Sequence, residues 1–526
     1  MKKTAPVQRY VIMPKVGFDG VALKNDMLAP AAGPQTLKAR ALSPVAAPTM
    51  RVLDQIGDNG PKLVEMPPEG ELSLRLSNPD LKIVPEVFYR RLWERQWVEK
   101  RPAGRRQASR KPARAGAKAV KTAAGAAASS GLTITIVDGK TSKPLKGVHV
   151  VLFTNFVDRI GQDGDTNAQG VVRLGAISPG QTIERAYVYG PPGYWGHYAA
   201  DVKASSLKQI ALAKVNPDDP KLLLNQLYGS LAADAGTGVT VAVIDTGVDG
   251  AHPALANVTG GLNCVTAETL SDPAARDRWG PAAKEGEHGT HVAGIIGGQV
   301  VGGWRGVAPG VKLRSYRVFP NSGGNASNFD IAKAIDAAVA DGCGVINMSL
   351  GGGPPDALTK AAIDRALNAG AVVVAAAGND GRKPVSYPAA FPECISVSAM
   401  GRKKSFPADS TGAADIMPPA GGAGGLDFVA AFSNFGSEID AVGPGVEIVS
   451  TLPDGEFGPM SGTSMATPAV AGFTAYVLHA NPEIDAASGA ERSRKLKDAL
   501  YSSCRPEGFG RDYEGFGLPH APADMS

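Results

Sequence analysis

Five apolar runs follow one another in the second half of the chain, and each has the length of a buried strand: VTVAVID, VKLRSYRVF, GVINMSL, AVVVAAAGN and ECISVSAM. Uninterrupted apolar runs are typical of parallel strands that are covered on both faces. Between some of them, in residues 328–342 and 356–370, apolar residues recur with helical spacing. Strands that alternate with helices predict an α/β domain with a doubly wound, mostly parallel sheet, which we place at residues 211–526.

Three polar blocks stand where such a sheet binds its ligands, at the carboxyl ends of strands or the amino ends of helices. VAVIDTGVDGAHP ends a strand at Asp245, EHGTHVAGIIGG opens a helix at His288, and MSGTSMATPAVAG opens a helix at Ser464. A serine hydroxyl is a weak nucleophile, so an imidazole must accept its proton and a carboxylate must orient that imidazole. Ser464, His288 and Asp245 supply these three roles.

A fourth block, AAAGND, places Asn379 after another strand. Attack on a carbonyl carbon creates an oxyanion, which needs hydrogen-bond donors already directed at it. We expect the side-chain amide of Asn379 and the backbone N–H of Ser464 to be that pair. Taken alone, each of these residues also fits a structural role, such as a helix cap or a turn. The ordered set of blocks is what favours catalysis.

The blocks DTGVD, HGTHVAG, SLGG, AAGN and GTSMATP occur in this order and resemble the active-site blocks of the subtilisin family. The chain order Asp, His, Ser is also the order in subtilisin. The resemblance implies the family fold and peptide-bond hydrolysis through an acyl-enzyme. It also implies a substrate strand that pairs with the backbone of Ser349, Leu350 and Gly351, and a supporting role for Thr463 beside the oxyanion hole.

In the same family, the loop after the oxyanion asparagine forms the primary specificity pocket. The corresponding loop is DGRKPVSYPAAFP, which puts Ser386 near the floor and Asp380 near the rim. A serine at the floor makes the pocket shallower than a glycine would, and Asp380 adds negative charge. We therefore expect a preference for small, medium-sized or basic side chains before the scissile bond.

Many extracellular subtilisins bind a tight calcium ion through an aspartate shortly after the first block and an asparagine-bearing loop after the catalytic histidine. Ala254 and residues 297–306, GGQVVGGWRG, occupy these places. Because Ca²⁺ requires several oxygen ligands, we expect neither this calcium site nor any cofactor. His291 lies one helical turn after His288 without the HExxH glutamate, so we expect it to be a packed structural residue.

Residues 1–97 read as a separate small α/β unit. RYVIMPKVG, MRVLDQI and LKIVPEVFY have strand patterns, and PPEGELSLRL fits a short helix. This order, together with the stretch PDLKIVPE, resembles the inhibitory propeptide of subtilisins, which implies a unit that assists folding and blocks the cleft. A plain interaction domain is the alternative interpretation.

Residues 98–131 are rich in alanine, glycine and basic residues and contain no aromatic residue, so they predict a linker. Residues 90–121 hold 12 basic and 2 acidic residues, although the whole chain has a formal net charge of only +4. A basic run without interleaved aromatic residues favours a solvated linker over a nucleic-acid or membrane partner.

Residues 132–210 have a β pattern. LTITIVD, VHVVLFTNF and VVRLGAI read as strands, joined by the turn-rich segments GKTSKPLKG and DGDTNAQG. They predict a small antiparallel sandwich that resembles transthyretin-like or carboxypeptidase-regulatory-like modules, with a spacer or accessory binding role. Residues 401–428, rich in glycine, alanine and proline, are expected to form an inserted surface loop.

No apolar window reaches the length of a signal-peptide core or a membrane span. The expected location is therefore the cytoplasm, or the exterior after export by a signal-free route. Proteins or peptides are the expected substrates, and the N-terminal region is the expected inhibitory partner.

Two alternatives to a serine endopeptidase stay open. The same fold also serves exopeptidases, and a scaffold protein whose protease domain is permanently inhibited by its N-terminal unit would carry the same blocks. For the endopeptidase we expect Ser464 to cleave the chain within residues 98–131, because exposed, extended segments are the usual sites of proteolysis.

Overall fold

The computed structural model describes residues 7–15, 50–93, 95–99, 131–418 and 425–520. Most of the predicted linker, residues 98–131, lies outside these ranges. The chain forms two compact units: a large unit of Met1–Glu94, Pro217–Phe406 and Asp415–Ser526, and a small unit of Arg95–Asn216 and Pro407–Ala414. The large unit therefore contains both the N-terminal region and the predicted active site.

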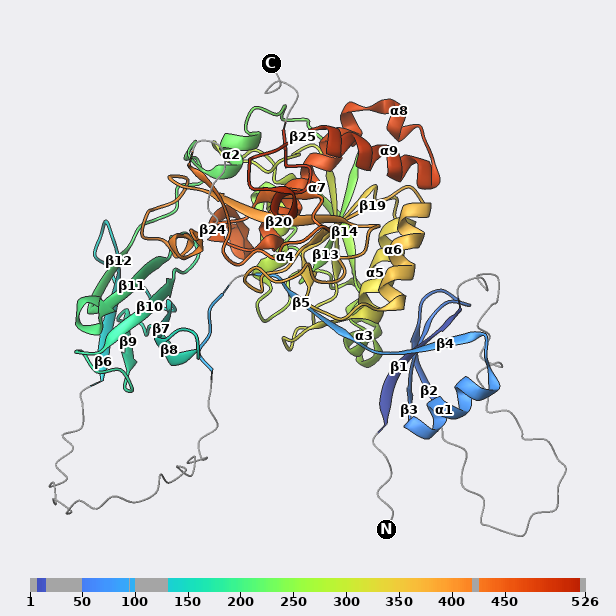
Figure 1. Cartoon of the computed structure of the whole chain (residues 1–526), viewed down its shortest axis with the longest axis horizontal. Helices are drawn as coiled ribbons and strands as arrows, with labels where there is room; N and C mark the ends of the chain where they lie inside the picture. Colours follow the sequence, from blue (N-terminus) through green and yellow to red (C-terminus); the bar gives the residue numbers. More distant parts are fainter. Residues whose placement is uncertain (1–6, 16–49, 94, 100–130, 419–424, 521–526) are drawn as a thin grey trace, which may run out of the picture. The chain divides into compact units, whose positions relative to one another are not determined.

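The large unit is built on an eight-stranded, mostly parallel sheet (Figure 1) with the order β14-β15-β13-β17-β19-β20-β21, in which β22 also pairs with β20. Its strands are β13 (Thr240–Asp245), β14 (Val258–Asn263), β15 (Lys312–Arg317), β17 (Val345–Met348), β19 (Val372–Ala376), β20 (Ile395–Arg402), β21 (Asp427–Val429) and β22 (Ala441–Pro444). Of these pairs, β20 with β21 is antiparallel and the others are parallel. Each predicted apolar run contains one of these strands, and the predicted α/β fold is confirmed.

Helices cover this sheet from both sides because successive side chains of a strand point to opposite faces. Ile244, Met348 and Ala375 share one core with α5 (Asn328–Ala340) and α6 (Ala357–Asn368). From the opposite face α4 (Glu287–Gly297) and α7 (Thr463–Ala480) pack against each other and against the strands.

Shorter elements complete the large unit. The helices are α2 (Leu223–Tyr228), α3 (Thr266–Ser271), α8 (Pro482–Asp485), α9 (Gly489–Ser502) and α10 (Arg511–Glu514). The short strands are β16 (Ala326–Ser327), β18 (Leu350–Gly351), β23 (Ile448–Leu452), β24 (Glu456–Met460), β25 (Cys504–Arg505) and β26 (Leu518–Pro519). In the described ranges, no helix is both long and apolar enough to cross a lipid bilayer.

The N-terminal part of the large unit is a four-stranded antiparallel sheet, in the order β2-β3-β1-β4, with one helix. Its elements are β1 (Gln8–Pro14), β2 (Arg51–Gln55), β3 (Lys62–Met66), α1 (Pro68–Ser77) and β4 (Leu81–Pro85). Ile12 and Ile83 on one face pack with Leu74 of α1, whereas Val11 and Leu63 on the other face join the core that contains α5 and α6. The sequence did not predict β3, because KLVEM is short and carries two charged residues.

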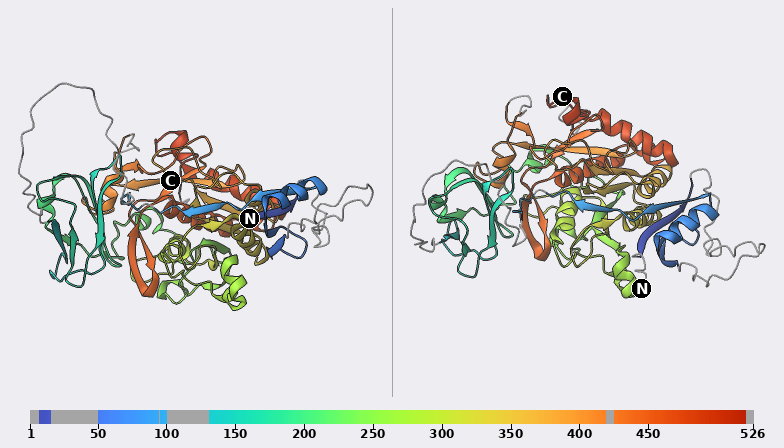
Figure 2. Two further views of the ribbon diagram at one scale, coloured as in Figure 1. Left: turned by 90° about the horizontal axis from the view of Figure 1, so that it is seen from below. Right: turned by 60° about the horizontal axis from the view of Figure 1, so that its bottom comes forward.

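Strand β5 (Phe88–Arg91) leaves this sheet, as the blue arrow in Figures 1 and 2 shows. The run LKIVPEVFY, predicted as one strand, is divided because β4 ends at Pro85, which has no N–H to donate. β5 lies between β16 and β18 and is antiparallel to both. Asn328 fixes the entry to β5, since its N–H donates to the carbonyl oxygen of Val87 at 2.8 Å.

The small unit contains two sheets, β11-β10-β7-β8 and β12-β6-β9, around one core. Its strands are β6 (Leu132–Asp138), β7 (His149–Asn155), β8 (Ile160–Asp165), β9 (Val171–Leu174), β10 (Thr182–Tyr189), β11 (His197–Lys203) and β12 (Gln209–Leu212). The sequence predicted β6, β7 and β9 and missed the other four, whose polar or glycine residues interrupt the alternation. Because β12 pairs with β6 in parallel, the sandwich is not wholly antiparallel as predicted.

Aromatic rings on the small unit hold the chain at residues 95–98. The guanidinium of Arg95 lies 5.0 Å from the ring centre of Tyr189, whose hydroxyl accepts a hydrogen bond from the backbone N–H of Gln96 at 2.8 Å. Val98 packs against the cluster formed by Val151, Phe153 and Tyr187. Pro407–Ala414, part of the predicted surface loop 401–428, also belongs to this unit.

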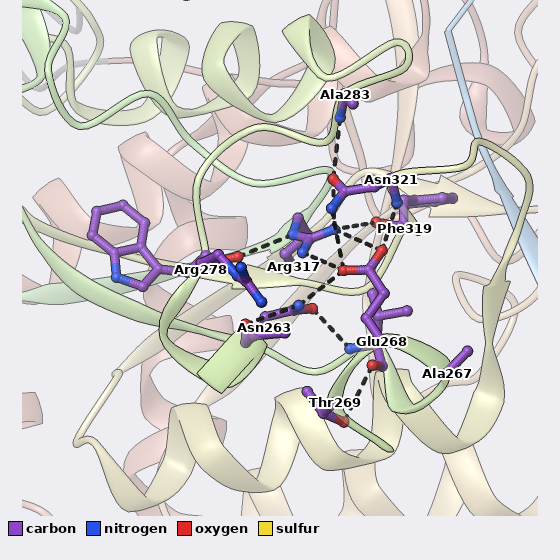
Figure 3. A network of polar contacts seen from close by, with 12 residues as sticks. Asn263, Ala267, Glu268, Thr269, Arg278, Ala283, Arg317, Phe319 and Asn321 are labelled. Atoms are coloured by element: carbon purple, nitrogen blue, oxygen red, sulfur yellow. Dashed lines mark hydrogen bonds and ion pairs between the residues drawn. The ribbon is translucent and has the colours of Figure 1, made fainter. Parts of the chain in front are cut away.

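A buried ion pair at the end of β15 joins helix α3, the loop after β15 and the loop before α4 (Figure 3). Arg317 is 1% exposed and its guanidinium lies 2.6 Å from the carboxylate of Glu268 in α3. Glu268 also accepts a hydrogen bond from the backbone N–H of Asn321 at 2.6 Å. The side chain of Asn321 accepts one from the N–H of Ala283 at 3.1 Å, in the loop that leads into α4. The network therefore fixes the chain before His288.

The charge of Glu268 makes this network sensitive to pH. Burial alone would raise the pKa of Glu268, but hydrogen bonds from Arg317 and from the backbone of Asn321 outweigh burial and lower that pKa. A carboxylate with a lowered pKa stabilises the folded state above its unfolded pKa of about 4.3, and this stabilisation is lost as the pH falls.

Replacement of Glu268 tests this network. In the Ser464→Ala background, Glu268→Gln is expected to lower the free energy of unfolding by about 1–3 kcal/mol at pH 7, because Arg317 stays buried without a charged partner. The difference in Tm should shrink at pH 3, where Glu268 is protonated in the unfolded chain. Glu491→Gln on the exposed face of α9 serves as a control with little effect. If the difference in Tm is equal at both pH values, the stabilisation does not come from the charge of Glu268.

Candidate active site

Three elements of the large unit bring the predicted triad together. Asp245 is the last residue of β13, His288 is the second residue of α4, and Ser464 is the second residue of α7. All three side chains are buried. The sheet supplies the carboxylate at a strand end, and the two packed helices supply the imidazole and the hydroxyl from their first turns.

The histidine is oriented for general-base catalysis. Its Nδ1 lies 2.8 Å from Oδ1 of Asp245, and that oxygen also accepts the backbone N–H of Thr246 at 2.6 Å. When Nδ1–H donates to Asp245, Nε2 is left to accept a proton. In the described part of the chain, Nε2 has no hydrogen-bond partner.

The hydroxyl of Ser464 donates to the carbonyl oxygen of Ser349 at 2.9 Å. The side chain of Ser349 donates in return to the carbonyl oxygen of Ser464 at 2.9 Å. The hydroxyl of Ser464 is thus paired with Ser349 in this structure. A proton transfer to His288 would require this hydroxyl to change its partner to Nε2 of His288.

The predicted oxyanion donors converge on one peptide oxygen of this same chain. Nδ2 of Asn379 donates to the carbonyl oxygen of Leu92 at 2.6 Å, and the backbone N–H of Ser464 donates to it at 3.3 Å. Thr463 orients the amide, because its N–H and its hydroxyl both donate to Oδ1 of Asn379, at 3.0 and 2.8 Å. The Nδ2 group is therefore turned toward Leu92.

A glycine beside the nucleophile is required for this approach. Gly462 has a φ of 151°, and a Cβ atom at this position would collide with the carbonyl oxygen of Leu92. The G of the GTSMATP block therefore leaves room for the carbonyl of Leu92.

Residues 88–93, which we call the cleft segment, lie along the predicted substrate strand. Arg91 faces Leu350 and Arg90 faces Gly351 in antiparallel register. Leu92 is 2% exposed, and the ring of Trp93 lies 6.3 Å from the imidazole of His288. The bond between Leu92 and Trp93 is therefore the peptide bond next to Ser464.

The two predicted specificity residues take different places. Ser386 borders the side chain of Leu92, because both lie beside Gly351. A Cβ atom on Gly351 would lie 2.8 Å from Cδ1 of Leu92 and 2.9 Å from Oγ of Ser386. Asp380 instead forms an ion pair with Arg90, two residues before Leu92. The charge of Asp380 therefore meets the side chain of Arg90 rather than that of Leu92.

His291 is buried, and its Nε2 lies 3.0 Å from the carbonyl oxygen of Gly458. Burial lowers the pKa of its imidazole to about 3, so the ring is neutral at physiological pH. Within the described ranges, no three His, Cys, Asp or Glu side chains cluster as metal ligands would.

The propeptide resemblance implied that residues 1–97 block the cleft, but the sequence did not indicate that the cleft segment is the part that enters it. The sequence showed only a strand pattern that ends at Tyr89. A strand pattern does not indicate with which other strands the segment pairs. The partners of β5, at Ala326–Ser327 and Leu350–Gly351, are distant in the chain. Only folding brings them together.

Comparison with known families matches residues 236–517 to the family described as the subtilase family, which is more than half of the chain. The chain belongs to the subtilase family. This subtilase is 37% identical to a subtilisin of Bacillus pumilus over 273 residues, which cover 51% of this chain and 86% of the relative.

Other relatives are similar over the same part of the subtilase. Subtilisin NAT of Bacillus subtilis subsp. natto is 38% identical over 252 residues, 47% of this chain and 57% of the relative. Subtilisin Savinase of Lederbergia lenta is 36% identical over 249 residues, 47% of this chain and 78% of the relative. The chain thus spans little more than half the length of subtilisin NAT.

The oxyanion donors of this subtilase lead to a mutational prediction. Asn379→Ala is expected to lower kcat on a chromogenic peptide by about 10²–10³-fold with a much smaller change in KM, because the amide binds the oxyanion more strongly than the ground-state carbonyl. Asn167→Ala, which removes an amide from a turn of the small unit, is the matched control. A change confined to KM contradicts the assigned role.

Proposed function

We propose that this subtilase is a serine endopeptidase in which Ser464 is the nucleophile, His288 the general acid and base, Asp245 its orienting group and Asn379 an oxyanion donor. One observation carries the proposal: the carbonyl oxygen of Leu92 lies 2.6 Å from Nδ2 of Asn379 and 3.3 Å from the backbone nitrogen of Ser464. A peptide carbonyl held by two donors beside a serine hydroxyl is the arrangement that acyl transfer requires.

The first half of the reaction forms the acyl-enzyme. Oγ of Ser464 attacks the carbonyl carbon while Nε2 of His288 accepts its proton, and Asp245 stabilises the resulting imidazolium. The carbonyl oxygen becomes an oxyanion held by Asn379 and the Ser464 N–H. Collapse of the tetrahedral intermediate breaks the peptide bond as His288 returns the proton to the leaving nitrogen.

The second half restores the enzyme. Water attacks the ester carbonyl and gives a proton to His288, and the same two donors hold the second oxyanion. Breakdown returns the proton to Ser464 and releases the new carboxyl group. Every proton is thus carried by one imidazole, which is why its tautomer must be fixed by Asp245.

Passage of the chain through the cleft favours an endopeptidase over an exopeptidase. β5 lies before Leu92, whose carbonyl oxygen meets Asn379, and Trp93 follows Leu92 beside the imidazole of His288. An exopeptidase would need one end of the cleft to be closed next to the scissile bond. The cleft of the large unit accepts a segment that has residues on both sides of that bond.

Self-processing is the second part of the proposal. The sequence predicted cleavage within residues 98–131, most of which lies outside the described residues. We now propose the bond between Leu92 and Trp93 instead, because its carbonyl is the one next to Ser464. Leu92 also agrees with the predicted preference for medium-sized side chains.

The N-terminal region would then act as an inhibitor that stays bound after cleavage. Its contacts do not depend on an intact chain: β5 pairs with β16 and β18, and Oδ2 of Asp54 accepts hydrogen bonds from Lys333 at 2.6 Å and from Thr266 at 3.0 Å. Its sheet also shares a hydrophobic core with α5 and α6. These contacts cover the substrate strand.

Catalysis without the family's tight calcium site is also proposed. Where the family's calcium-binding loop would lie, Trp304 is 1% exposed and its indole N–H donates to the carbonyl oxygen of Val449 at 3.1 Å. The carbonyl oxygen of Ala254 accepts the N–H of Gln299 at 2.8 Å. An indole and an engaged carbonyl do not fit a calcium ion, which needs six to eight oxygen ligands.

Self-processing can be tested on the purified chain. The wild type is expected to yield a fragment of residues 1–92 and a fragment that begins at Trp93, whereas Ser464→Ala should stay uncut at this bond, as intact-mass measurement and N-terminal sequencing would show. A wild-type chain that stays full length, or is cut only within residues 98–131, contradicts the proposed bond.

A fluorophosphonate probe separates an active enzyme from a permanently inhibited scaffold. We expect the probe to label the wild type at Ser464 and to leave Ser464→Ala unlabelled. Absence of label on the processed wild type, even after the N-terminal fragment has been digested by added trypsin, would contradict the catalytic proposal.

Chelation tests the calcium proposal. Peptide cleavage by the wild type and the Tm of Ser464→Ala are expected to be unchanged by EGTA, because the residues at that place do not supply the ligands. A fall in Tm that Ca²⁺ restores and Mg²⁺ does not restore would overturn it.

A further inference from the structure

The side chains of the cleft segment indicate which residues the cleft accepts, because this segment pairs with Leu350 and Gly351 as a substrate is expected to do. Leu92 is the first residue before the scissile bond, Arg91 the second, Arg90 the third and Tyr89 the fourth. Each of these side chains meets a different part of the large unit. Their contacts can therefore be used to infer the sequence that the enzyme prefers.

Tyr89 enters a closed pocket. The side chain is fully buried, and its hydroxyl donates to Oδ2 of Asp356 and lies 3.2 Å from the carbonyl oxygen of Pro354. A Cβ atom on Gly353 would lie 2.6 Å from the ring, so the glycine makes room for an aromatic side chain. The pocket combines space for a ring with an acceptor at its far end.

Asp356 is fixed in the orientation that meets the hydroxyl. As the N-cap of α6, its Oδ1 accepts the backbone N–H groups of Leu358 at 3.1 Å and Thr359 at 2.9 Å. Oδ1 also accepts the side-chain amide of Asn328 at 3.1 Å. These three bonds occupy one oxygen and leave Oδ2 for the tyrosine.

A phenyl ring in this pocket would leave Oδ2 of Asp356 buried without a donor. Such a group loses its hydration and gains nothing in return, which is the reason that sites built for a hydroxyl reject analogues that lack it. Burial and the charge of Asp356 raise the pKa of Tyr89, so the phenol stays protonated and remains a donor.

Carboxylates also meet both arginines. Arg91 forms an ion pair with Glu285, and Arg90 forms one with Asp380. Glu285 has a φ of 53°, which non-glycine residues rarely adopt. Each pair has one partly exposed partner, since the side chain of Glu285 is 54% exposed and that of Arg90 is 43% exposed, so we expect each pair to contribute modestly.

We propose that the protease selects substrates of the pattern Tyr-Arg-Arg-Leu before the scissile bond, with Asp356 as the residue that selects tyrosine over phenylalanine. Glu285 and Asp380 add a preference for basic residues at the second and third positions. This inference rests on the proposed endopeptidase function and names its substrate class: segments with a tyrosine followed by a basic pair.

The test uses internally quenched peptides and the processed wild-type protein after its N-terminal fragment has been digested by trypsin and the trypsin has been removed. Peptides with Tyr-Arg-Arg-Leu are expected to exceed those with Phe-Arg-Arg-Leu in kcat/KM by about 10- to 100-fold, the value of one hydrogen bond to a buried charge. Tyr-Gln-Gln-Leu should fall by roughly two- to fivefold per arginine at low salt, and by less at high salt.

Two variants test whether Asp356 causes the preference for tyrosine over phenylalanine. Asp356→Asn keeps a good N-cap for α6 and is expected to reduce the ratio of tyrosine to phenylalanine peptides to about threefold or less. Asp364→Asn, on the exposed side of the same helix, should leave the ratio unchanged. Equal cleavage of both peptides by the wild type, or an unchanged ratio in Asp356→Asn, overturns the proposal.

A second measurement needs no activity. In full-length Ser464→Ala, Tyr89→Phe should raise the rate of hydrogen exchange in β5, whereas Phe88→Leu, at a half-exposed position, should not. If the wild type freed of its N-terminal fragment cleaves no peptide, the endopeptidase proposal fails, and this exchange experiment still decides whether Asp356 recognises the hydroxyl. Equal exchange in Tyr89→Phe and its parent contradicts that recognition.

Discussion

The structure depends on one constraint: a parallel sheet covered on both faces presents its strand ends at a single edge. Asp245 ends β13, Ser349 follows β17, and Asn379 lies just beyond β19. Helices α4 and α7 begin at this edge and add His288 and Ser464 from their first turns. The amino end of α7 also carries the backbone N–H that meets the carbonyl of the cleft segment, where the helix dipole favours negative charge.

The cleft segment ties the N-terminal region to this edge through backbone pairing, and its side chains set the register. A shift of one residue would turn Tyr89 out of its pocket and move the carbonyl of Leu92 away from Asn379. The contact of Tyr89 with Asp356 and that of Leu92 with Asn379 therefore act on the same short segment, three residues apart. In the proposal, recognition of the fourth residue would determine which peptide bond meets Ser464.

Within the small unit, aromatic packing holds the chain where this unit begins. Residues 95–98 pack on the aromatic cluster of the small unit, through the ring of Tyr189 and its hydroxyl. The spacer or accessory binding role that the sequence predicts for this unit stays a prediction.

The sequence by itself determined the α/β fold, the family and the order of the functional blocks, because apolar runs, glycines and polar strand ends are local patterns. It could not determine that Tyr89 meets Asp356, that Asp380 pairs with Arg90, or that Leu92 lies at Ser464. It also missed β3 and four strands of the small unit, whose polar residues hide the alternation. These features depend on which distant segments pack together. Pairing and burial, unlike local propensity, are decided only when the whole chain has folded.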